Sequence, residues 1–135
     1  MRIESYPLQM KMGESDLKEK NALGWHWLVD FYDCEQLPSE PAVLEGMLVE
    51  AAKLAGATVV QSCFHRFSPH GLSGVVVIAE SHLAAHTWPE HRAMCIDIFS
   101  CSHRIHSQVA IDYVASQIQA ARVETRSIVR GDLID

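Results

Sequence analysis

The stretch Ser73-Gly-Val-Val-Val-Ile-Ala-Glu-Ser81-His-Leu-Ala-Ala-His86-Thr-Trp88-Pro-Glu90, followed by Ile96-Asp-Ile-Phe-Ser-Cys101, organises the rest of the chain. It predicts a buried strand ending at Glu80-Ser81, a second strand studded with polar side chains, and a third strand ending at a cysteine. Ser81, His86 and Cys101 are then expected to lie at neighbouring ends of adjacent strands. Such a place could hold a small reactive site.

The flanking sequence supplies further strands and two helices. Trp25–Asp33 is rich in aromatic and β-branched residues and predicts a first strand. Ser39 or Glu40 then stands at a helix cap, Pro41 lies in the first turn, and Gly56 is a natural stop. The remaining predicted elements are a helix at Ser107–Ala121 and strands at Thr58–Phe64, Gly74–Ala79, Leu83–Thr87, Met94–Phe99 and Val123–Val129. Strands in runs with two separated helices predict an α+β two-layer sandwich, a largely antiparallel β-sheet with both helices on one face.

Length and composition fit one globular domain: the chain has 135 residues, of which 48% are hydrophobic and 21% charged. We assign the domain to residues 24–135 and expect residues 1–23, which are polar and lack a clear period, to be a flexible N-terminal extension. The chain has neither an apolar run long enough to cross a membrane nor the apolar core of a secretory signal, so a cytoplasmic location is expected. In that reducing compartment the cysteines stay thiols, three of them as small buried side chains.

The charge balance excludes one class of partner. The formal net charge of -6 argues against nucleic acid, because phosphate binding needs clustered Lys and Arg side chains. It is compatible with a cationic small-molecule substrate. Acidic domains of many functions share this charge, so it does not choose among them.

The central motif, Glu-Ser-His-Leu-x-x-His-Thr-Trp-Pro-Glu at 80–90, has Ser-Gly-Val-Val-Val-Ile before it and Asp-x-Phe-x-Cys after it. It closely resembles the short prokaryotic S-adenosylmethionine decarboxylase proenzymes, and the likeness runs from about Gly24 to the C-terminus. The resemblance implies a pyruvoyl-dependent carboxy-lyase that cleaves itself and then decarboxylates S-adenosylmethionine, giving the aminopropyl donor for spermidine and other polyamines. It also implies a homodimer of cleaved protomers, because the short proteins resemble half of a fused eukaryotic enzyme.

The resemblance also assigns the residues of self-cleavage. The scissile bond would be Glu80-Ser81, giving a β chain of residues 1–80 and an α chain of residues 81–135. Ser81 would become the pyruvoyl group that forms a Schiff base with the substrate. His86 corresponds to the family's processing base, and Ser73 corresponds to its processing serine.

Four further residues correspond to those that meet the substrate. Phe67 and Trp88 match the aromatic pair that sandwiches adenine, and aromatic faces also suit a sulfonium cation. Glu90 matches the residue that binds the ribose hydroxyls. Cys101 matches the cysteine that protonates the substrate carbon after CO₂ has left, a role that suits the pKa of a thiol.

Neither pyridoxal phosphate nor a metal is expected as cofactor. Pyridoxal phosphate would need a lysine in the site, and none of the four lysines follows the motif: Lys11, Lys18, Lys20 and Lys53. His82 and His86 would share one face of a strand, but the chain lacks His-Glu-x-x-His. That spacing permits a two-histidine metal site without indicating one.

Two alternatives stay open. Where the family usually has Tyr-Gly-Tyr-Ala after Trp-Pro-Glu this chain has His91–Cys95, and Ser102 replaces the glycine that usually follows the cysteine. These departures lie near the expected substrate pocket and leave room for a pyruvoyl-dependent arginine or ornithine decarboxylase. The second alternative is an unprocessed homologue that acts as a binding module, against which the retention of Ser81, His86 and Cys101 argues.

Overall fold

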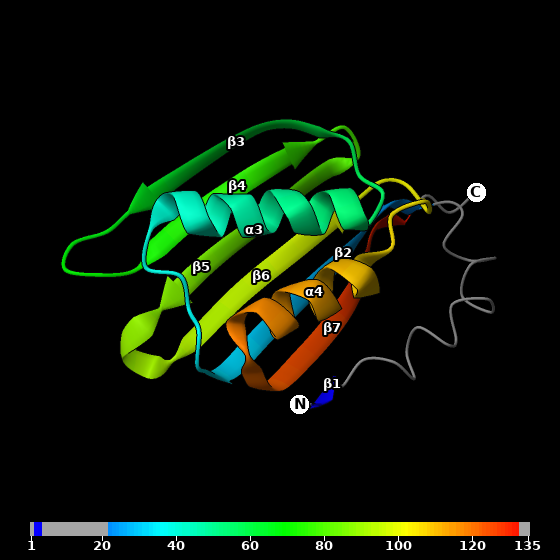
Figure 1. Cartoon of the computed structure of the whole chain (residues 1–135). Coiled ribbons are helices and arrows are strands. Elements are labelled where there is room, and N and C mark those ends of the chain that lie inside the picture. The colour runs from blue at the N-terminus through cyan, green and yellow to red at the C-terminus, as the bar shows by residue number, and fades with distance from the viewer. Residues whose placement is uncertain (1, 4–21, 133–135) are drawn as a thin grey trace.

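The computed structural model describes residues 2–3 and 22–132 as a single sheet with two helices across one of its faces (Figure 1). This confirms the predicted α+β sandwich. The elements in chain order are β1 (Arg2–Ile3), β2 (Ala22–Cys34), α3 (Pro41–Leu54), β3 (Val59–Arg66), β4 (Leu72–Ile78), β5 (Ser81–Trp88), a short 3₁₀ turn η1 (Pro89–His91), β6 (Ala93–Ser100), α4 (Ser107–Ile118) and β7 (Ala120–Asp132).

The sheet has the strand order β1-β7-β2-β6-β5-β4-β3. Among the described strands only β1 pairs in parallel, with β7, and every other pair is antiparallel. The three strands of the organising stretch, β4, β5 and β6, lie side by side as expected. From Ser81 to His86, β5 is paired with β4 on one side and β6 on the other, and this pairing on both sides keeps that part of the strand rigid.

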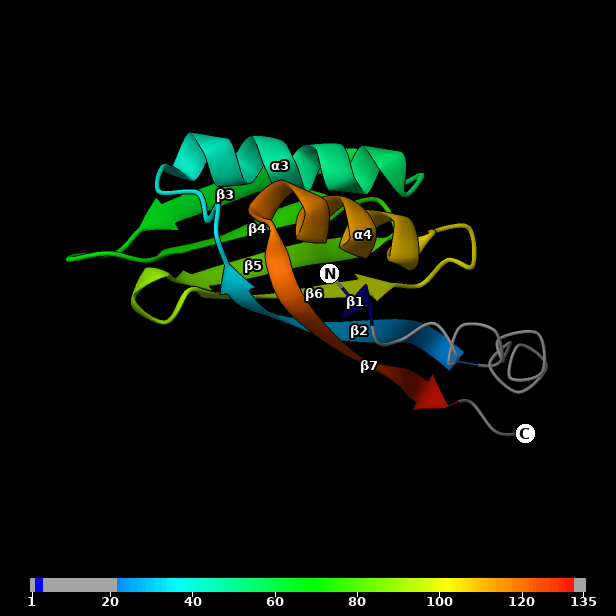
Figure 2. The ribbon, with the colours of Figure 1, turned by 60° about the horizontal axis from the view of Figure 1, so that its bottom comes forward.

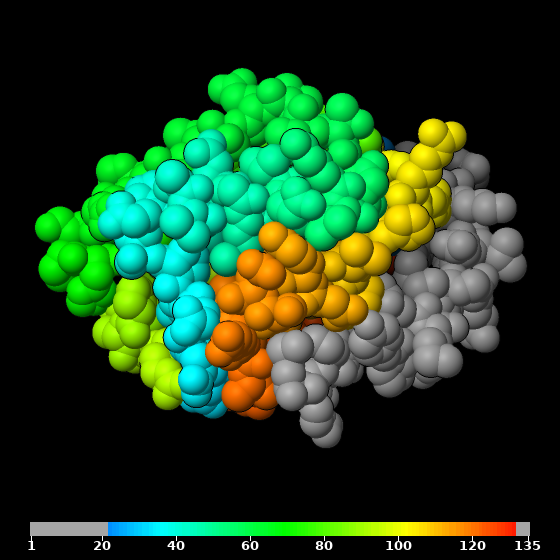
Figure 3. Space-filling model, viewed as in Figure 1, coloured from blue at the N-terminus to red at the C-terminus, as the bar shows by residue number. Residues whose placement is uncertain are grey.

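Side chains alternate between a buried and a more open face of the sheet. In β6, Met94, Ile96 and Ile98 are at most 2% exposed, and the residues between them are only partly buried. Both helices cover the buried face, and no described helix covers the other, which we call the open face (Figure 2). Seen from the helix side, the side chains of α3 and α4 pack against each other and close over the core (Figure 3).

The predicted start of α3 is confirmed, whereas the predicted end of α4 is not. Glu40 is the N-cap residue of α3 but makes no side-chain cap bond, and the carbonyl of Ser39 instead accepts a hydrogen bond from Arg66. The predicted helix Ser107–Ala121 is too long: α4 ends at Ile118, because Gln119 turns left-handed with φ 51°. Ala120 then pairs with Cys34 as the first residue of β7.

Residues 1 and 4–21 of the predicted N-terminal extension lie outside the described residues, so its flexibility stays a prediction. Of its remaining residues, Arg2 and Ile3 pair with β7, and Ala22 and Leu23 begin β2. Across the part of the chain that the structure describes, no helix is long and apolar enough to cross a membrane.

Candidate active site

The first group of predicted site residues lies at the hairpin between β4 and β5. Only Ala79 and Glu80 separate these strands, and Ser81 pairs with Ile78 on one side and Ser100 on the other. Ser81 has φ 150°, which a residue with a Cβ rarely adopts and which stores backbone strain. The predicted scissile bond therefore enters a strained residue that its neighbours on both strands hold in place.

Hydrogen bonds fix Glu80 from two directions. Its carbonyl oxygen accepts a bond from the backbone N–H of Cys101 at 2.9 Å. Its carboxylate accepts one from the N–H of Thr58 at 3.2 Å, and the N–H of Ala79 donates to the carbonyl of Thr58 at 2.8 Å. The carbonyl that Ser81 would attack is thus polarised by a fixed donor, as in an oxyanion hole.

Cys101 follows the last residue of β6 and has an exposed side chain. The Ser100 hydroxyl shapes the turn around it, because Ser100 Oγ donates to the carbonyl of Ser102 and accepts from the N–H of Ser102, both at 3.0 Å. As expected, Ser81 and Cys101 lie at neighbouring ends of adjacent strands.

The second group gathers at the opposite end of β5. Ser73 and His86 face each other across β4 and β5, with Ser73 Oγ 2.8 Å from His86 Nδ1. Phe67, Trp88 and Glu90 join them around a pocket of about 270 Å³. Both aromatic side chains are exposed, at 49% and 41%, so they are available to a ligand and do not serve as core.

Glu90 is already paired in this pocket. Its carboxylate lies 3.0 Å from His70 Nε2, and His70 also lines the pocket. The sequence does not single out His70, and this contact could not be predicted from it. No local pattern signals the pair, because the two residues belong to different loops.

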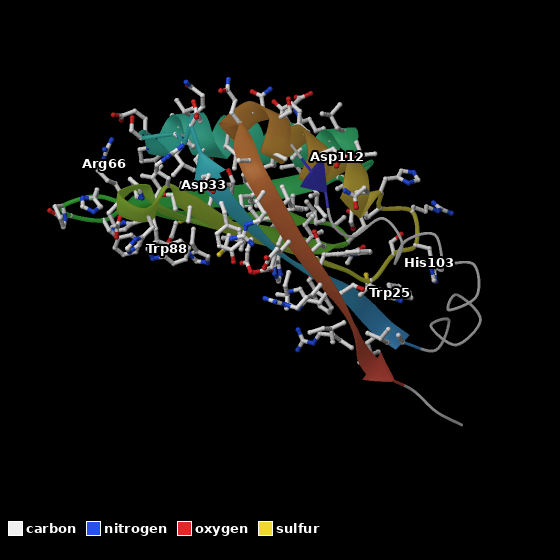
Figure 4. The ribbon with its side chains drawn as sticks, turned by 90° about the horizontal axis from the view of Figure 1, so that it is seen from below. Trp25, Asp33, Arg66, Trp88, His103 and Asp112 are labelled. Carbon is white, nitrogen blue, oxygen red and sulfur yellow. The ribbon has the colours of Figure 1, made fainter. Side chains whose placement is uncertain are left out.

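The two groups do not meet within one chain, and the expectation that His86 lies beside Ser81 is wrong. A strand rises about 3.3 Å per residue, so the five steps along β5 separate the two residues by roughly 17 Å. In Figure 4 the labelled Trp88 and His103, which lies just beyond Cys101, occupy opposite ends of the sheet. The rigid pairing of β5 leaves no bend that could close this gap.

The turn at Glu80 and Ser81, which holds the predicted scissile bond, is called the scissile turn below. A polar cluster on the open face lies next to it. Asp97 Oδ1 is 2.7 Å from His82 Nε2 and 3.1 Å from His26 Nε2, and Arg130 Nη1 is 3.2 Å from His26 Nδ1. Burial acts to raise the pKa of Asp97, but the hydrogen bonds from His82 and His26 outweigh it and lower that pKa below its ordinary value. Strand alternation places His82 on this face, whereas its partners come from strands whose register the sequence does not reveal.

The same three side chains bear on the metal question. Ligand atoms of His26, His82 and Asp97 lie within 4.8 Å of one another, whereas His82 and His86 have separate partners. A guanidinium can only donate, so Arg130 makes Nδ1 of His26 the acceptor and Nε2 the protonated nitrogen. The contacts are therefore those of a hydrogen-bonded array, and the expectation that no metal is used stays a prediction.

Two of the other cysteines, Cys34 and Cys95, are more buried than Cys101. Burial and a hydrogen bond to Asp30 raise the pKa of Cys95 to about 12, and burial raises that of Cys34 to about 11. Both therefore stay protonated, as expected of structural thiols. Cys63 was expected to be buried as well, but it is exposed on the edge strand β3.

A larger pocket, of about 370 Å³, opens between the start of β2, the turn at Cys101 and the N-terminus of α4. Trp25 and His103 line it, and their ring centroids are 4.2 Å apart. Figure 4 labels both side chains at this end of the sheet. The buried Nε1 of Trp25 has no hydrogen-bond partner among the described residues. None of the predicted site residues lines this pocket, and the sequence indicated Trp25 only as part of a strand.

Comparisons with known proteins identify related sequences and a related structure. A family model described as S-adenosylmethionine decarboxylase matches residues 25–131. The S-adenosylmethionine decarboxylase proenzyme of Moorella thermoacetica is 44% identical over 111 residues, 82% of this chain and 89% of that protein. The proenzyme of Acidithiobacillus ferrooxidans is 41% identical over 114 residues, 83% of this chain and 85% of its own length.

One solved structure is similar to this chain in fold as well as in sequence. The crystal structure of the adenosylmethionine decarboxylase from Aquifex aeolicus superposes with a TM-score of 0.75 at 32% identity, covering 85% of this chain and 95% of that one. These comparisons give no support to an arginine or ornithine decarboxylase or to an unprocessed binding module.

Proposed function

The chain belongs to the S-adenosylmethionine decarboxylase family, and from this we propose that it is a proenzyme that cleaves itself between Glu80 and Ser81 and then decarboxylates S-adenosylmethionine. The product would be the aminopropyl donor for spermidine and other polyamines. The observation that carries the proposal is the scissile turn, a strained Ser81 beside a carbonyl polarised by the N–H of Cys101. A cytoplasmic location stays a prediction from the sequence.

The scissile turn suits the formation of a pyruvoyl group from Ser81. We propose that Ser81 Oγ attacks the carbonyl carbon of Glu80, while the N–H of Cys101 stabilises the negative charge on the carbonyl oxygen. The C–N bond then breaks, the freed amine takes up the proton, and an ester joins the two residues. Relief of the strain at Ser81 favours this step.

A base then removes the α-proton of residue 81, and the ester C–O bond breaks to release Glu80 as a carboxylate. Water replaces the nitrogen, which leaves as ammonia, and a pyruvoyl group remains at the start of residues 81–135. Such a carbonyl, conjugated to a substrate amine, supplies the electron sink that decarboxylation requires. We assign the base to His86, oriented by Ser73 through their 2.8 Å contact.

His86 has to come from a second copy of the chain. A base acts within about 3 Å of the proton it removes, whereas the two residues lie roughly 17 Å apart along β5. A two-fold axis through the open face, near Ala84 between them, would bring each Ser81 opposite the other chain's His86. The proposed enzyme is therefore a homodimer of cleaved protomers with two shared active sites.

The residues around the 270 Å³ pocket would hold the substrate in the same shared site. Phe67 and Trp88 offer exposed faces for adenine and for the sulfonium cation. The Glu90 carboxylate, kept in place by His70, would accept hydrogen bonds from the ribose hydroxyls. Cys101, exposed beside Ser81, would deliver the proton to the substrate carbon.

The test is intact mass spectrometry of the purified protein, incubated with S-adenosylmethionine, arginine or ornithine and then reduced with borohydride. We expect fragments of residues 1–80 and 81–135, with release of CO₂. Borohydride alone adds two hydrogens to the pyruvoyl ketone of the second fragment, and only S-adenosylmethionine should give that fragment the larger mass of a reduced amine adduct. The matched control is Ser81→Ala, which should stay one chain. An uncleaved wild-type chain, or an amine adduct formed only from arginine or ornithine, would overturn the proposal.

A further inference from the structure

We propose that Asp97 is a positioning residue that holds Ser81 in its strained conformation by anchoring His82, the residue after the scissile bond. The inference rests on the proposed self-cleavage at Glu80-Ser81 and adds a device that drives it. It concerns the open-face array of Asp97, His82, His26 and Arg130, which has no role in the proposed cleavage and decarboxylation reactions.

The direction of the hydrogen bonds makes Asp97 the centre of this array. Arg130 donates to Nδ1 of His26, so Nε2 of His26 carries a proton and donates to Asp97 Oδ1 at 3.1 Å. His82 Nε2 donates to the same oxygen at the shorter distance of 2.7 Å. The hydrogen bond from His26 thus fixes the Asp97 carboxylate, and the carboxylate in turn accepts the hydrogen bond from His82.

Packing limits the freedom of the His82 ring further. The Phe99 ring lies 6.0 Å from His82 and 5.2 Å from His26, centroid to centroid, and the Arg130 guanidinium stands 5.1 Å from the Phe99 centroid. His82 and Phe99 are also cross-strand partners. With its flank against this ring and its Nε2 on Asp97, the His82 side chain has one defined position.

Strand β6 and the residue that follows it therefore hold the scissile turn on both sides. The N–H of Cys101 holds the carbonyl of Glu80, and the carboxylate of Asp97 holds the side chain of His82. Ser81 lies between these anchors with φ 150°, whereas an antiparallel strand has φ near about -140°. Released on the His82 side, the backbone could relax toward the ordinary strand conformation, and the hydroxyl would lose its position for attack.

The expected change in the rate of self-cleavage follows from the strength and the solvent exposure of the hydrogen bond between His82 and Asp97. Hydrogen bonds to a charged group are the strong ones, but His82 and Asp97 side chains are 33% and 27% exposed, so solvent screens part of the contact. We therefore expect loss of the carboxylate to slow self-cleavage by about tenfold, the lower end of what such a bond can supply.

The experiment follows cleavage of full-length chains made by cell-free synthesis, chased and separated by mass. Asp97→Ala should cleave about tenfold more slowly than wild type, and His82→Ala should be slowed similarly. Asp97→Asn keeps an acceptor oxygen and should fall between wild type and Asp97→Ala. Asp30→Ala, which removes another partly buried carboxylate of the open face bonded to Cys95 and Arg126, is the matched control and should cleave at the wild-type rate.

The double variant separates positioning from a general structural role. If Asp97 acts through His82, adding Asp97→Ala to His82→Ala causes no further slowing, whereas independent effects would multiply and overturn the inference. A wild-type rate for Asp97→Ala also overturns it. Circular dichroism and gel filtration show whether Asp97→Ala folds and dimerises. If it does not, Asp97→Asn decides: a cleavage rate between those of wild type and His82→Ala supports the inference, whereas a wild-type rate, or a rate below that of His82→Ala, overturns it. An uncut wild-type chain would instead refute the proposed function itself.

Discussion

Two variants that are each unable to cleave themselves should restore cleavage when they share one dimer. Ser81→Ala removes the attacking hydroxyl and keeps His86, and His86→Ala does the reverse. Along β5 the two positions lie roughly 17 Å apart, several times the reach of a catalytic base. Each residue must therefore act on a second copy of the chain.

The expected yield follows from the symmetry. When equal amounts of the two variants associate at random, about half of the dimers contain one chain of each kind. In such a dimer one site combines Ser81 of the His86→Ala chain with His86 of the other chain, and the second site lacks both. About half of the His86→Ala chains, and about a quarter of all chains, should be cut.

The assay is co-expression of the two variants with different affinity tags, sequential purification of mixed dimers, and intact mass analysis. Fragments should come only from the His86→Ala chain. Ser81→Ala paired with a chain carrying both substitutions is the control and should give none. Intact chains in purified mixed dimers, or cleavage of His86→Ala on its own, would refute the shared site.

Three further predictions address chemistry, pH dependence and stability. Cys101→Ala keeps the backbone N–H that polarises Glu80, so self-cleavage should continue while CO₂ release falls by about 10²-fold or more, measured by mass and by labelled substrate. The pKa of Asp97 is lowered in the folded chain because the hydrogen bonds from His82 and His26 outweigh the effect of burial. The ionised carboxylate therefore stabilises the fold at pH values above its unfolded pKa of about 3.9. This stabilisation is lost as the pH falls through the pKa of Asp97 in the folded chain. The gap in free energy of unfolding between wild type and Asp97→Asn should therefore narrow from about pH 6 to about pH 3 in urea titrations, and an unchanged gap would contradict it. Leu48→Ala empties a fully buried position in α3 and should cost about 2–5 kcal/mol of unfolding free energy, whereas a change at exposed Val43 in the same helix should cost far less.

The sequence predicts most of the fold because local patterns and burial agree. Alternation in Met94–Phe99 and helical spacing around Leu48 mark elements that the structure contains. The error at the end of α4 arose because Ala120 and Ala121 favour a helix locally, but the tertiary pairing of Ala120 with Cys34 prevails.

The site was predictable as a set of residues but not as an arrangement. The motif singles out Ser81, His86 and Cys101, yet the distance between the first two follows only once β5 is known to run straight between them. The contact of Asp97 with His26 depends on the register between β2 and β6, which no local pattern specifies. Local sequence patterns therefore do not predict the long-range strand pairing on which the arrangement of the site depends.

The separation of the two residue groups at opposite ends of β5 has a consequence for gene evolution. A tandem duplication that fused two copies of this chain would encode both ends twice, and one complete shared site would use only the scissile end of one half and the histidine end of the other. Selection would then act on one end of each half, and the unused ends would be free to accumulate substitutions.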